Sequence, residues 1–312
     1  PIHRLLQMFL RQKVVIDAAT VCGWLKAVGT LIELLYDALR QEVLNTHSLG
    51  IDETPLKVLD KNKKGTTHQG YYWVYYNTLN NLVLFNYQPG RDGGCPKEML
   101  HGYKGHIHVD GYGAYTQFEN TPDIIVSNCW AHARRKFIDA GSFDNVRASE
   151  VLTLIAQLYG VEKHCREHDF TTDQIKQVRQ QQSVPILAAI QLVLKTQLTT
   201  SIPNSPLGKA IQYTLSRWQK LNVYTQEGFL PIDNNRVENS IRPIAIGRKN
   251  WLFAGSHEAA GRSAMLYSLF ATCRLHNVEP MQWLTEVLTK IKDHPINKIK
   301  ELLPQNYYAG TQ

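Results

Sequence analysis

Leu-Gly-Ile-Asp-Glu-Thr-Pro-Leu-Lys-Val-Leu, residues 49–59, is an apolar run of strand length with acidic residues in its interior. Residues 71–78 and 82–87 are also rich in β-branched, aromatic and other apolar side chains, which is typical of strands. Between these two runs, Asn80-Asn81 has the residue types that favour a tight hairpin turn. The three runs therefore predict three adjoining strands.

Further along the chain, strand-like runs alternate with helical patterns. Residues 106–110 and 124–128 predict a fourth and a fifth strand, and residues 96–100 predict a short helix before them. A basic helix is expected directly after the fifth strand. Adjoining strands followed by strand–helix alternation predict an α/β fold, with a mixed sheet and flanking helices.

The remaining segments have apolar residues at three- and four-residue spacing, which indicates helices. Residues 5–28 are compatible with a helix-turn-helix, in which Asp17 caps the second helix, and also with a plain helical pair. Ser205-Pro206 predicts the start of another helix. We expect a helical N-terminal region, a sheet domain in two pieces, an all-helical insertion and a C-terminal helical element, at residues 1–46, 47–145 with 229–265, 146–228 and 266–312.

The composition is that of a globular protein with a basic surplus. The 312 residues are 43% hydrophobic and 20% charged, with a formal net charge of +7. This charge is compatible with a polyanionic partner but does not require one. We find no run of about 18 apolar residues that would span a membrane. The five cysteines are scattered and form no Cys-x-x-Cys pair, which predicts a reduced, cytoplasmic protein without a zinc ribbon.

Three acidic residues differ from the others in their surroundings. Asp52 and Asp110 lie within or at the end of apolar strand-like runs, where an uncompensated carboxylate would be costly to desolvate. Glu238 lies in a polar, basic segment at the expected start of a helix. Three oxygen donors of this kind suit Mg²⁺ or Mn²⁺ better than zinc. Because the chain has 27 acidic residues, each of the three taken singly could equally be structural.

The sequence motifs around these acids resemble those of the insertion-sequence-66 family of DDE transposases, and the resemblance covers nearly the whole chain. The motifs that carry the resemblance occur in the family's order; they are Asp52-Glu53-Thr54-Pro55, Gly70-Tyr71-Tyr72-Trp73-Val74-Tyr75, Asp110-Gly111-Tyr112-Gly113-Ala114-Tyr115, Ala131-His132-Ala133-Arg134-Arg135-Lys136-Phe137, Asp233-Asn234-Asn235 with Glu238-Asn239, Ile241-Arg242-Pro243 and residues 247–255. The tail, with Asp293-His294-Pro295 and Glu301-Leu302-Leu303-Pro304, is similar to the family's C-terminal element.

The resemblance implies a ribonuclease-H-like fold in which Asp52, Asp110 and Glu238 are the catalytic residues and hold two Mg²⁺ or Mn²⁺ ions. The implied activity is metal-dependent hydrolysis and strand transfer at insertion-sequence ends. Two alternatives remain open, a ribonuclease-H-like nuclease that cuts without joining and an inactive, domesticated DNA-binding relative. Gly50 stands where many members carry a histidine. No motif here matches the family's N-terminal zinc-binding region, as expected of a truncation or a short variant.

The implied partners are DNA, at the transposon ends and the target, a second copy of the chain on that DNA, and accessory proteins of the same element. No membrane partner is expected, and the implied location is the bacterial nucleoid. Seven basic residues are predicted to contact phosphates, and they are Arg134, Arg135, Lys136, Arg242, Arg248, Lys249 and Arg262. Trp251 is predicted to stack on an unpaired base, whereas Phe253 is expected in the core.

Cys129 and His132 form a Cys-x-x-His motif directly after the fifth strand-like run. As a zinc site this motif is half complete, because no second ligand pair with suitable spacing accompanies it. We therefore predict that the two residues do not bind zinc. A packed cysteine and a hydrogen-bonding histidine that shape the floor of the site are the favoured interpretation.

Overall fold

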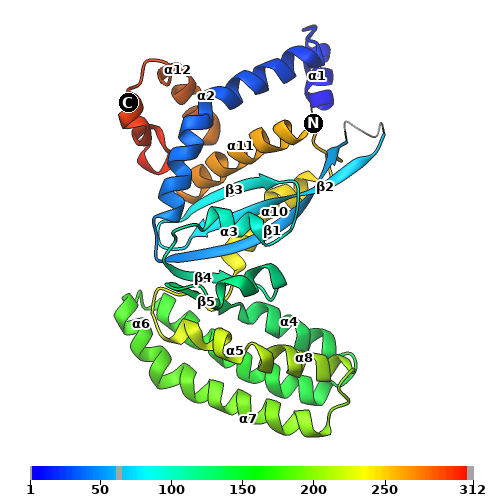
Figure 1. Ribbon diagram of the computed structural model, residues 1–312, viewed down its shortest axis with the longest axis vertical. Coiled ribbons are helices and arrows are strands. Elements are labelled where there is room, and N and C mark those ends of the chain that lie inside the picture. The colour runs from blue at the N-terminus through cyan, green and yellow to red at the C-terminus, as the bar shows by residue number, and fades with distance from the viewer. Residues whose placement is uncertain (1, 61–64, 308–312) are drawn as a thin grey trace. The chain divides into compact units, whose positions relative to one another are not determined.

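The computed structural model describes residues 2–60 and 65–307 (Figure 1). Five strands are present, at bounds close to those expected from the sequence; they are β1 (Ser48–Leu59), β2 (Thr67–Asn77), β3 (Leu82–Gln88), β4 (Gly105–Val109) and β5 (Ile124–Asn128). They form one sheet in the order β3-β2-β1-β4-β5. The pairs β1–β4 and β4–β5 are parallel and the pair β2–β3 is antiparallel. The mixed sheet with flanking helices confirms the predicted α/β, ribonuclease-H-like fold class.

The chain divides into two compact units. Unit 1 comprises Pro1–Thr46, Asp52–His101 and Val237–Gln312, and unit 2 comprises His47–Ile51 and Gly102–Arg236. The division falls within β1, so that the first residues of this strand belong to unit 2 and its later residues to unit 1. This partition rests on compactness, and the four segments expected from the sequence remain a prediction.

The hairpin of unit 1 forms at the predicted place. Tyr71 to Asn77 pair in antiparallel register with Gln88 to Leu82. Asn81 has a φ of 52°, a left-handed conformation that asparagine tolerates better than most residues. Asn77 Oδ1 accepts hydrogen bonds from the backbone N–H groups of Leu79 and Asn80 at 3.1 and 3.0 Å. The turn therefore satisfies its own donors.

One face of the unit 1 sheet is covered by α10 (Asn235–Gly247) and α11 (His257–Leu275). Their core cluster contains alternate residues of the three strands and apolar residues of both helices; its buried members are Leu56, Val58, Tyr72, Val74, Tyr76, Val83, Phe85, Val237, Ile244, Ala260 and Ala264. Residue 254 also forms a parallel bridge with Val58, which joins the segment between the two helices to β1.

The backbone of β3, an edge strand of the sheet, is bonded to side chains of neighbouring helices. The Phe85 N–H donates to Ser268 Oγ at 2.8 Å, and the Val83 N–H donates to Thr272 Oγ1 at 3.5 Å. The Tyr36 hydroxyl donates to the Phe85 carbonyl at 2.9 Å. Ser268 and Thr272 belong to α11, which runs along β3 in Figure 1. These helices therefore supply the partners that a further strand would otherwise provide.

The N-terminal region is a 10-residue helix, α1 (Ile2–Arg11), and a 27-residue helix, α2 (Ala18–Leu44). Asp17 occupies the N-cap position of α2, but its side chain makes no capping bond there. The helix continues without a break beyond residue 28, as far as Leu44. Gly29 lies against the side-chain stem of Arg262, where a Cβ would come within 2.5 Å of Cδ. The close approach explains the glycine within a continuous helix.

By length and composition, α2 also satisfies the criteria for crossing a membrane. An 18-residue window of this helix has a mean hydropathy of 1.4, and 22% of that window is buried. The sequence has no unbroken run of 18 apolar residues here, because Lys26 and Glu33 interrupt the apolar residues of the helix, so the two criteria differ. A single helix of this kind is weak evidence, because the core helix of a soluble protein meets the same criteria. Leu35 and Leu39 of α2 are fully buried in unit 1.

The C-terminal helices also belong to unit 1. The helix α12 (Pro280–Lys290) is followed by two 3₁₀ segments, η4 (Ile296–Leu302) and η5 (Pro304–Asn306). Trp283 is fully buried and donates its indole N–H to the Leu302 carbonyl at 3.0 Å. This bond ties the end of η4 to α12. A short helix, α3 (Gly94–Met99), confirms the one expected between β3 and β4.

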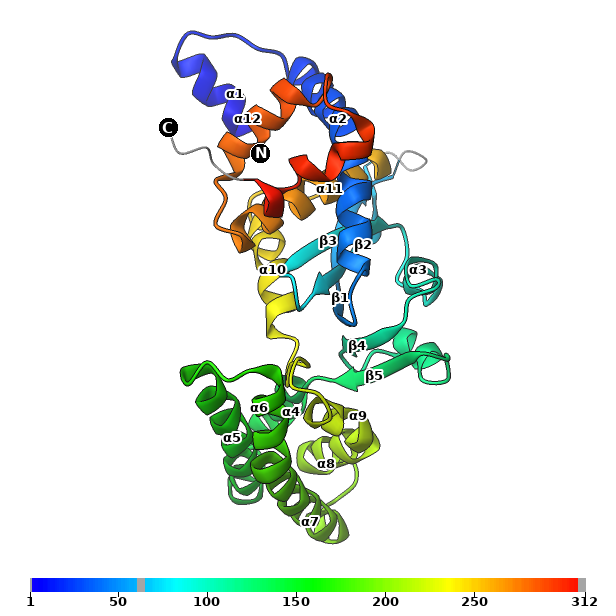
Figure 2. The same ribbon diagram turned by 90° about the vertical axis from the view of Figure 1, so that its left-hand side faces the viewer.

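Unit 2 is mainly helical beyond β4 and β5 (Figure 2). After η1 (Gly113–Phe118) its helical segments are α4 (Trp130–Ala140), α5 (Asn145–Glu167), α6 (Thr172–Val178), η2 (Arg179–Ser183), α7 (Val184–Thr200), α8 (Pro206–Ser216), α9 (Trp218–Asn222) and η3 (Val223–Thr225). Ser205 caps α8 by accepting from the Gly208 N–H at 3.0 Å, as predicted. A single core cluster reaches from Trp130 to Ile232, so the helical insertion packs on the helix that follows β5.

A buried ion pair lies inside this helical part. Arg179 Nε and Nη2 donate to the two carboxylate oxygens of Glu162 at 2.8 and 2.7 Å. Arg179 Nη1 also donates to the carbonyls of Tyr224 and Glu227, both at 2.7 Å. Side-chain exposure is 3% for Arg179 and 8% for Glu162. The pair therefore links α5, η2 and the end of the insertion.

Candidate functional site

Asp52 lies on the face of β1 that α10 covers. Side chains alternate between the two faces of a strand, so Asp52 shares a face with Leu56. Leu56 belongs to the same buried cluster as Val237 of α10. Glu238 follows Val237 in the first turn of this helix. Two of the three predicted metal ligands, Asp52 and Glu238, are therefore on the same side of the sheet within unit 1.

Glu53, next to Asp52, has a different environment. Its side chain is 2% exposed, and Arg91 Nε donates to its Oε1 at 2.8 Å. The extended conformation of β1 directs Glu53 to the face opposite Asp52. The Asp52 Oδ1 accepts from the Glu53 N–H at 2.8 Å, which helps to fix its carboxylate. Glu53 is therefore an ion-paired structural acid.

Asp110 directly follows β4 in unit 2. Its Oδ1 accepts from the Tyr112 N–H at 2.8 Å, and its carbonyl accepts from Asn128 Nδ2 at 3.1 Å. His108, two residues earlier, is completely buried, and its Nδ1 lies 2.9 Å from Ser127 Oγ. Burial lowers the pKa of His108 to about 3, so this imidazole is neutral at physiological pH.

A hydrogen-bond network in unit 2 joins three segments that border the predicted ligands. Asn234 Nδ2 donates to the carbonyl of Ile51, the residue before Asp52, at 3.1 Å. The Asn234 N–H donates to Cys129 Sγ at 3.2 Å, and the neighbouring Asn128 amide bonds the Val109 and Asp110 carbonyls. Asn234 is 2% exposed and lies one helical turn before Glu238. Within unit 2, the network therefore fixes the backbone of Ile51 and of Asp110.

Cys129 is accordingly a packed residue that accepts a hydrogen bond. Burial raises the pKa of its thiol to about 12, which keeps the sulfur protonated. In residues 2–60 and 65–307, no three His, Cys, Asp or Glu side chains are grouped as metal ligands would be. Asp52 and Glu238 belong to unit 1 and Asp110 belongs to unit 2. The assignment of the three acids as ligands, and the absence of zinc at Cys129 and His132, remain predictions.

The predicted phosphate-binding residues of unit 2 are on the surface. Arg134, Arg135 and Lys136 are all exposed on α4. The first two line a cavity of about 370 Å³ together with Tyr159 and Asn235. Lys136 Nζ lies 5.6 Å from the centre of the Tyr213 ring. Their exposure leaves the predicted role in DNA binding open.

The predicted DNA-binding residues of unit 1 differ among themselves. Arg242 and Lys249 are exposed, whereas Arg248 Nη1 donates to Thr54 Oγ1 at 2.7 Å and to the Pro55 carbonyl. The stem of Arg262 packs against Gly29. Arg248 and Arg262 therefore have structural contacts in addition to any contact with DNA.

The two aromatic residues of this segment differ in how far they are buried. Trp251 is partly buried and packs against the core cluster of unit 1. Phe253 is 43% exposed, so the expectation that it lies in the core is wrong. The short polar segment between α10 and α11 carries no apolar periodicity, and the sequence therefore gave no signal for which ring faces inward. Base stacking by Trp251 remains a prediction.

We expect Arg248→Ala and Lys249→Ala to have different effects. Arg248→Ala removes charged hydrogen bonds to Thr54, which is 4% exposed, and should lower the free energy of unfolding by about 1.5–3 kcal/mol. Lys249→Ala should leave stability unchanged and reduce the slope of log affinity for DNA against log salt by about one. Urea denaturation and salt titrations of duplex binding measure the two quantities. Equal stability of the two variants would contradict the structural role of Arg248.

Sequence reasoning missed Asn128, Asn234 and Arg217. The first two make the backbone bonds described above, and Arg217 Nη2 donates to the Gly111 carbonyl at 3.2 Å. Asn234 and its acceptor Ile51 are 183 positions apart. The motif Asp233-Asn234-Asn235 was the one available signal, and it gave no indication of a partner. Arg217 lies between two helices with no motif around it.

Two family matches cover nearly all of the chain. Residues 1–262 match the family described as Transposase IS66 family, and residues 268–305 match the IS66 C-terminal element. The first match includes Asp52, Asp110 and Glu238 and the whole helical insertion. The second begins within α11 and ends in η5.

Curated relatives are longer than this chain. The uncharacterized protein y4qI of Sinorhizobium fredii is 31% identical over 324 residues, which cover 98% of this chain and 59% of the relative. The uncharacterized protein y4jD of the same organism is 29% identical, over 99% of this chain and 63% of its own length. This chain therefore spans about three fifths of the relatives' length. The ordered motifs, the mixed sheet and the match over residues 1–262 together show that this chain belongs to the IS66 family of transposases.

Proposed function

We propose that this chain is the catalytic part of a DNA transposase that cleaves insertion-sequence ends and joins them to target DNA. The observation that supports this most directly is the position of Asp52 on the face of β1 covered by α10, the helix that carries Glu238. Both acids lie inside the segment that matches the transposase family. An acid on a central strand and an acid on the helix packed above it form a suitable pair of ligands.

The third ligand is proposed from the pairing of two parallel strands. Gly50 of β1 is in register with His108 of β4. Asp52 and Asp110 each follow their paired residue by two positions along strands of the same direction. Because both acids lie two residues beyond the same parallel pair, we propose that they have a common role.

The donor set fits hard divalent cations. Asp52, Asp110 and Glu238 would hold two Mg²⁺ or Mn²⁺ ions, because carboxylate oxygens are the ligands that these ions prefer. When bound, such ions activate a hydroxyl nucleophile and stabilise negative charge on the leaving oxygen. In this proposal the chain orients the carboxylates. The Glu53 and Tyr112 N–H groups bond one oxygen of Asp52 and of Asp110, each at 2.8 Å.

The proposed partners follow from the basic surface and the proposed reaction. Exposed Arg134, Arg135, Lys136, Arg242 and Lys249 would contact phosphates of the transposon end or the target. Two transposon ends require two sites, so we propose that the chain acts as a homo-oligomer on DNA. Accessory proteins of the same element and a location at the bacterial nucleoid belong to the same proposal.

Joining of a DNA end to a target tests this function. Duplexes that carry the ends of the encoding element are incubated with the chain, Mg²⁺ and a target plasmid, and cleaved and joined products are resolved on a gel. We expect both products, with joining dependent on a free 3′-hydroxyl. Cleavage without joining would identify a nuclease instead. Binding with neither product would identify an inactive DNA-binding relative.

A further inference from the structure

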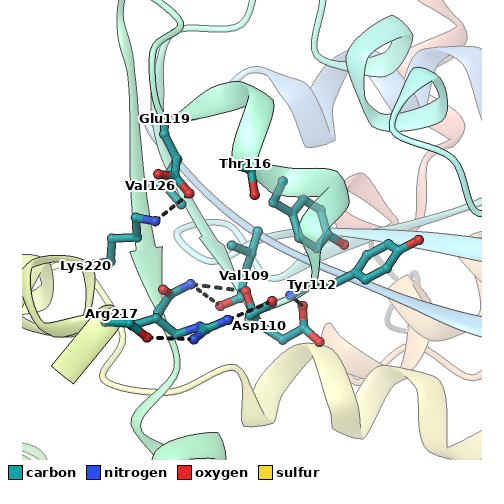
Figure 3. A pocket seen from close by; sticks show the side chains of 12 residues that line it. Val109, Asp110, Tyr112, Thr116, Glu119, Val126, Arg217 and Lys220 are labelled. Atoms are coloured by element: carbon teal, nitrogen blue, oxygen red, sulfur yellow. Dashed lines mark hydrogen bonds and ion pairs between the residues drawn. The ribbon is translucent and has the colours of Figure 1, made fainter. Parts of the chain in front are cut away.

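A cavity of about 290 Å³ lies beside Asp110, entirely within unit 2 (Figure 3). Its walls come from the loop after β4, from η1 and from the junction of α8 and α9, and they include Asp110, Tyr112, Thr116, Arg217 and Lys220. The volume is near the lower end of the range of about 300–1,000 Å³ for small-molecule sites. The helical insertion therefore contributes two cations to a cavity bordered by a proposed metal ligand.

Arg217 is held in place in this cavity. Its guanidinium carbon lies 4.1 Å from the centre of the Tyr213 ring. Nη1 donates to the Tyr213 carbonyl and to Ser216 Oγ, and Nη2 donates to the Gly111 carbonyl at 3.2 Å. A guanidinium has five N–H donors, so these three bonds leave two for a ligand. The stacked, planar group is thus pre-oriented rather than free to rotate.

Gly111 allows this close approach. A Cβ at this position would come within 2.5 Å of Arg217 Nε and within 2.9 Å of Nη2. Any larger residue would push the guanidinium away from the residue that follows Asp110. The glycine and the arginine are therefore matched, although 106 positions separate them.

Of the two cationic side chains that line the cavity, Arg217 is the one not engaged in an ion pair within the described part of the chain, and it can therefore contact a ligand. Lys220 forms an ion pair with Glu119 on the opposite wall. Asp110 would be occupied by the cations that it is proposed to hold. A guanidinium with two spare donors binds a phosphate oxyanion well, because its fork matches two phosphate oxygens. Tyr112 adds an aromatic face of the kind on which nucleotide bases stack.

We propose that this cavity binds the deoxyribonucleotide next to the scissile bond and that Arg217 contacts its phosphate. The inference rests on the proposed function, because it places DNA at Asp110. The insertion then has a specific part in the reaction, since it supplies a substrate-binding cation to a site whose acids come from the sheet domain. The DNA contacts predicted from the sequence, on α4 and between Arg242 and Arg262, did not include this cavity.

The test combines Arg217 variants with DNA in which single phosphates are neutral. Methylphosphonates are placed one at a time at the phosphates on either side of the scissile bond, and single-turnover cleavage rates are measured. For the native chain, we expect one neutral position to slow cleavage about tenfold to a hundredfold, the range for a lost charged hydrogen bond. Arg217→Ala should slow cleavage of unmodified DNA by a similar factor. At that one position the two changes should not add.

Two further variants repeat this test of Arg217, and a third serves as the control. Arg217→Gln keeps a donor for Gly111 but removes the charge, and it should show the same non-additivity even if the alanine variant is poorly folded. Gly111→Ala should reproduce the effect by displacing the guanidinium. Arg166→Ala, an exposed arginine on α5, should leave all rates unchanged. Additive losses at every phosphate would overturn the Arg217 contact while leaving the transposase function intact. Absence of cleavage by the native chain would overturn both.

Discussion

Replacing Asp52, Asp110 or Glu238 with alanine should reduce cleavage and joining by a factor of at least about a thousand. The proposed ions supply several kcal/mol of charge stabilisation in the transition state, and each lost carboxylate removes a ligand that holds them. The measurement is the single-turnover rate on end duplexes in Mg²⁺. Mn²⁺ binding to each variant, followed by electron paramagnetic resonance, provides a readout that does not depend on activity.

Matched controls separate loss of ligands from loss of fold. Asp139→Ala removes an exposed acid from α4 and should leave the rate and the Mn²⁺ binding unchanged. Thermal unfolding of the three acid variants should stay close to that of the native chain, because Asp52, Asp110 and Glu238 are not part of the two core clusters. If one acid variant kept native activity, that residue would not be a ligand, and the three-carboxylate site would be wrong.

Arg179→Ala should destabilise unit 2 more than any surface substitution. The change leaves Glu162 with an uncompensated charge in the interior and leaves the Tyr224 and Glu227 carbonyls without this donor. Breaking a buried pair on one side costs about 3–5 kcal/mol. Glu162→Ala, which leaves Arg179 buried without its ion-pair partner, should have an effect of similar size. Denaturant unfolding monitored by tryptophan fluorescence measures both.

The double variant Arg179→Met with Glu162→Leu tests the physical cause. Replacing both charges by apolar side chains of comparable volume is often close to neutral, because no charge remains to be desolvated. We therefore expect the double variant to recover most of the stability lost by either single variant. A loss below about 1 kcal/mol in Arg179→Ala, a value typical of exposed pairs, would contradict the buried character of this bridge.

The sheet was predictable from the sequence because its signals are local. The aromatic and β-branched content of residues 71–77, the Asn80-Asn81 turn and the apolar run of residues 124–128 each specify a strand or a turn within a few positions. The same holds for Ser205, whose cap needs only the residues that follow it. These local preferences agree with the tertiary packing, and the observed bounds of the strands are accordingly close to the expected ones.

The failures arose where packing decided the outcome. Phe253 was expected in the core but is 43% exposed, whereas Trp251 packs against the core cluster of unit 1. Asp52 and Asp110 could be singled out because an acid in an apolar strand is unusual. Asn234 and Arg217 could not, since their roles depend on bonds to the distant carbonyls of Ile51 and Gly111. A polar residue in a loop has no sequence pattern that identifies its acceptor.

The capped edge of β3 has a consequence for how copies of this chain can associate. An exposed edge strand can recruit another strand by backbone pairing, and this route leads to sheet extension or aggregation. Here the N–H groups of Val83 and Phe85 and the Phe85 carbonyl are already bonded to side-chain hydroxyls of α11 and α2. Self-association by strand addition along β3 would require those bonds to break and α11 to detach. Copies of the chain that assemble on DNA would therefore not be joined by strand pairing along β3.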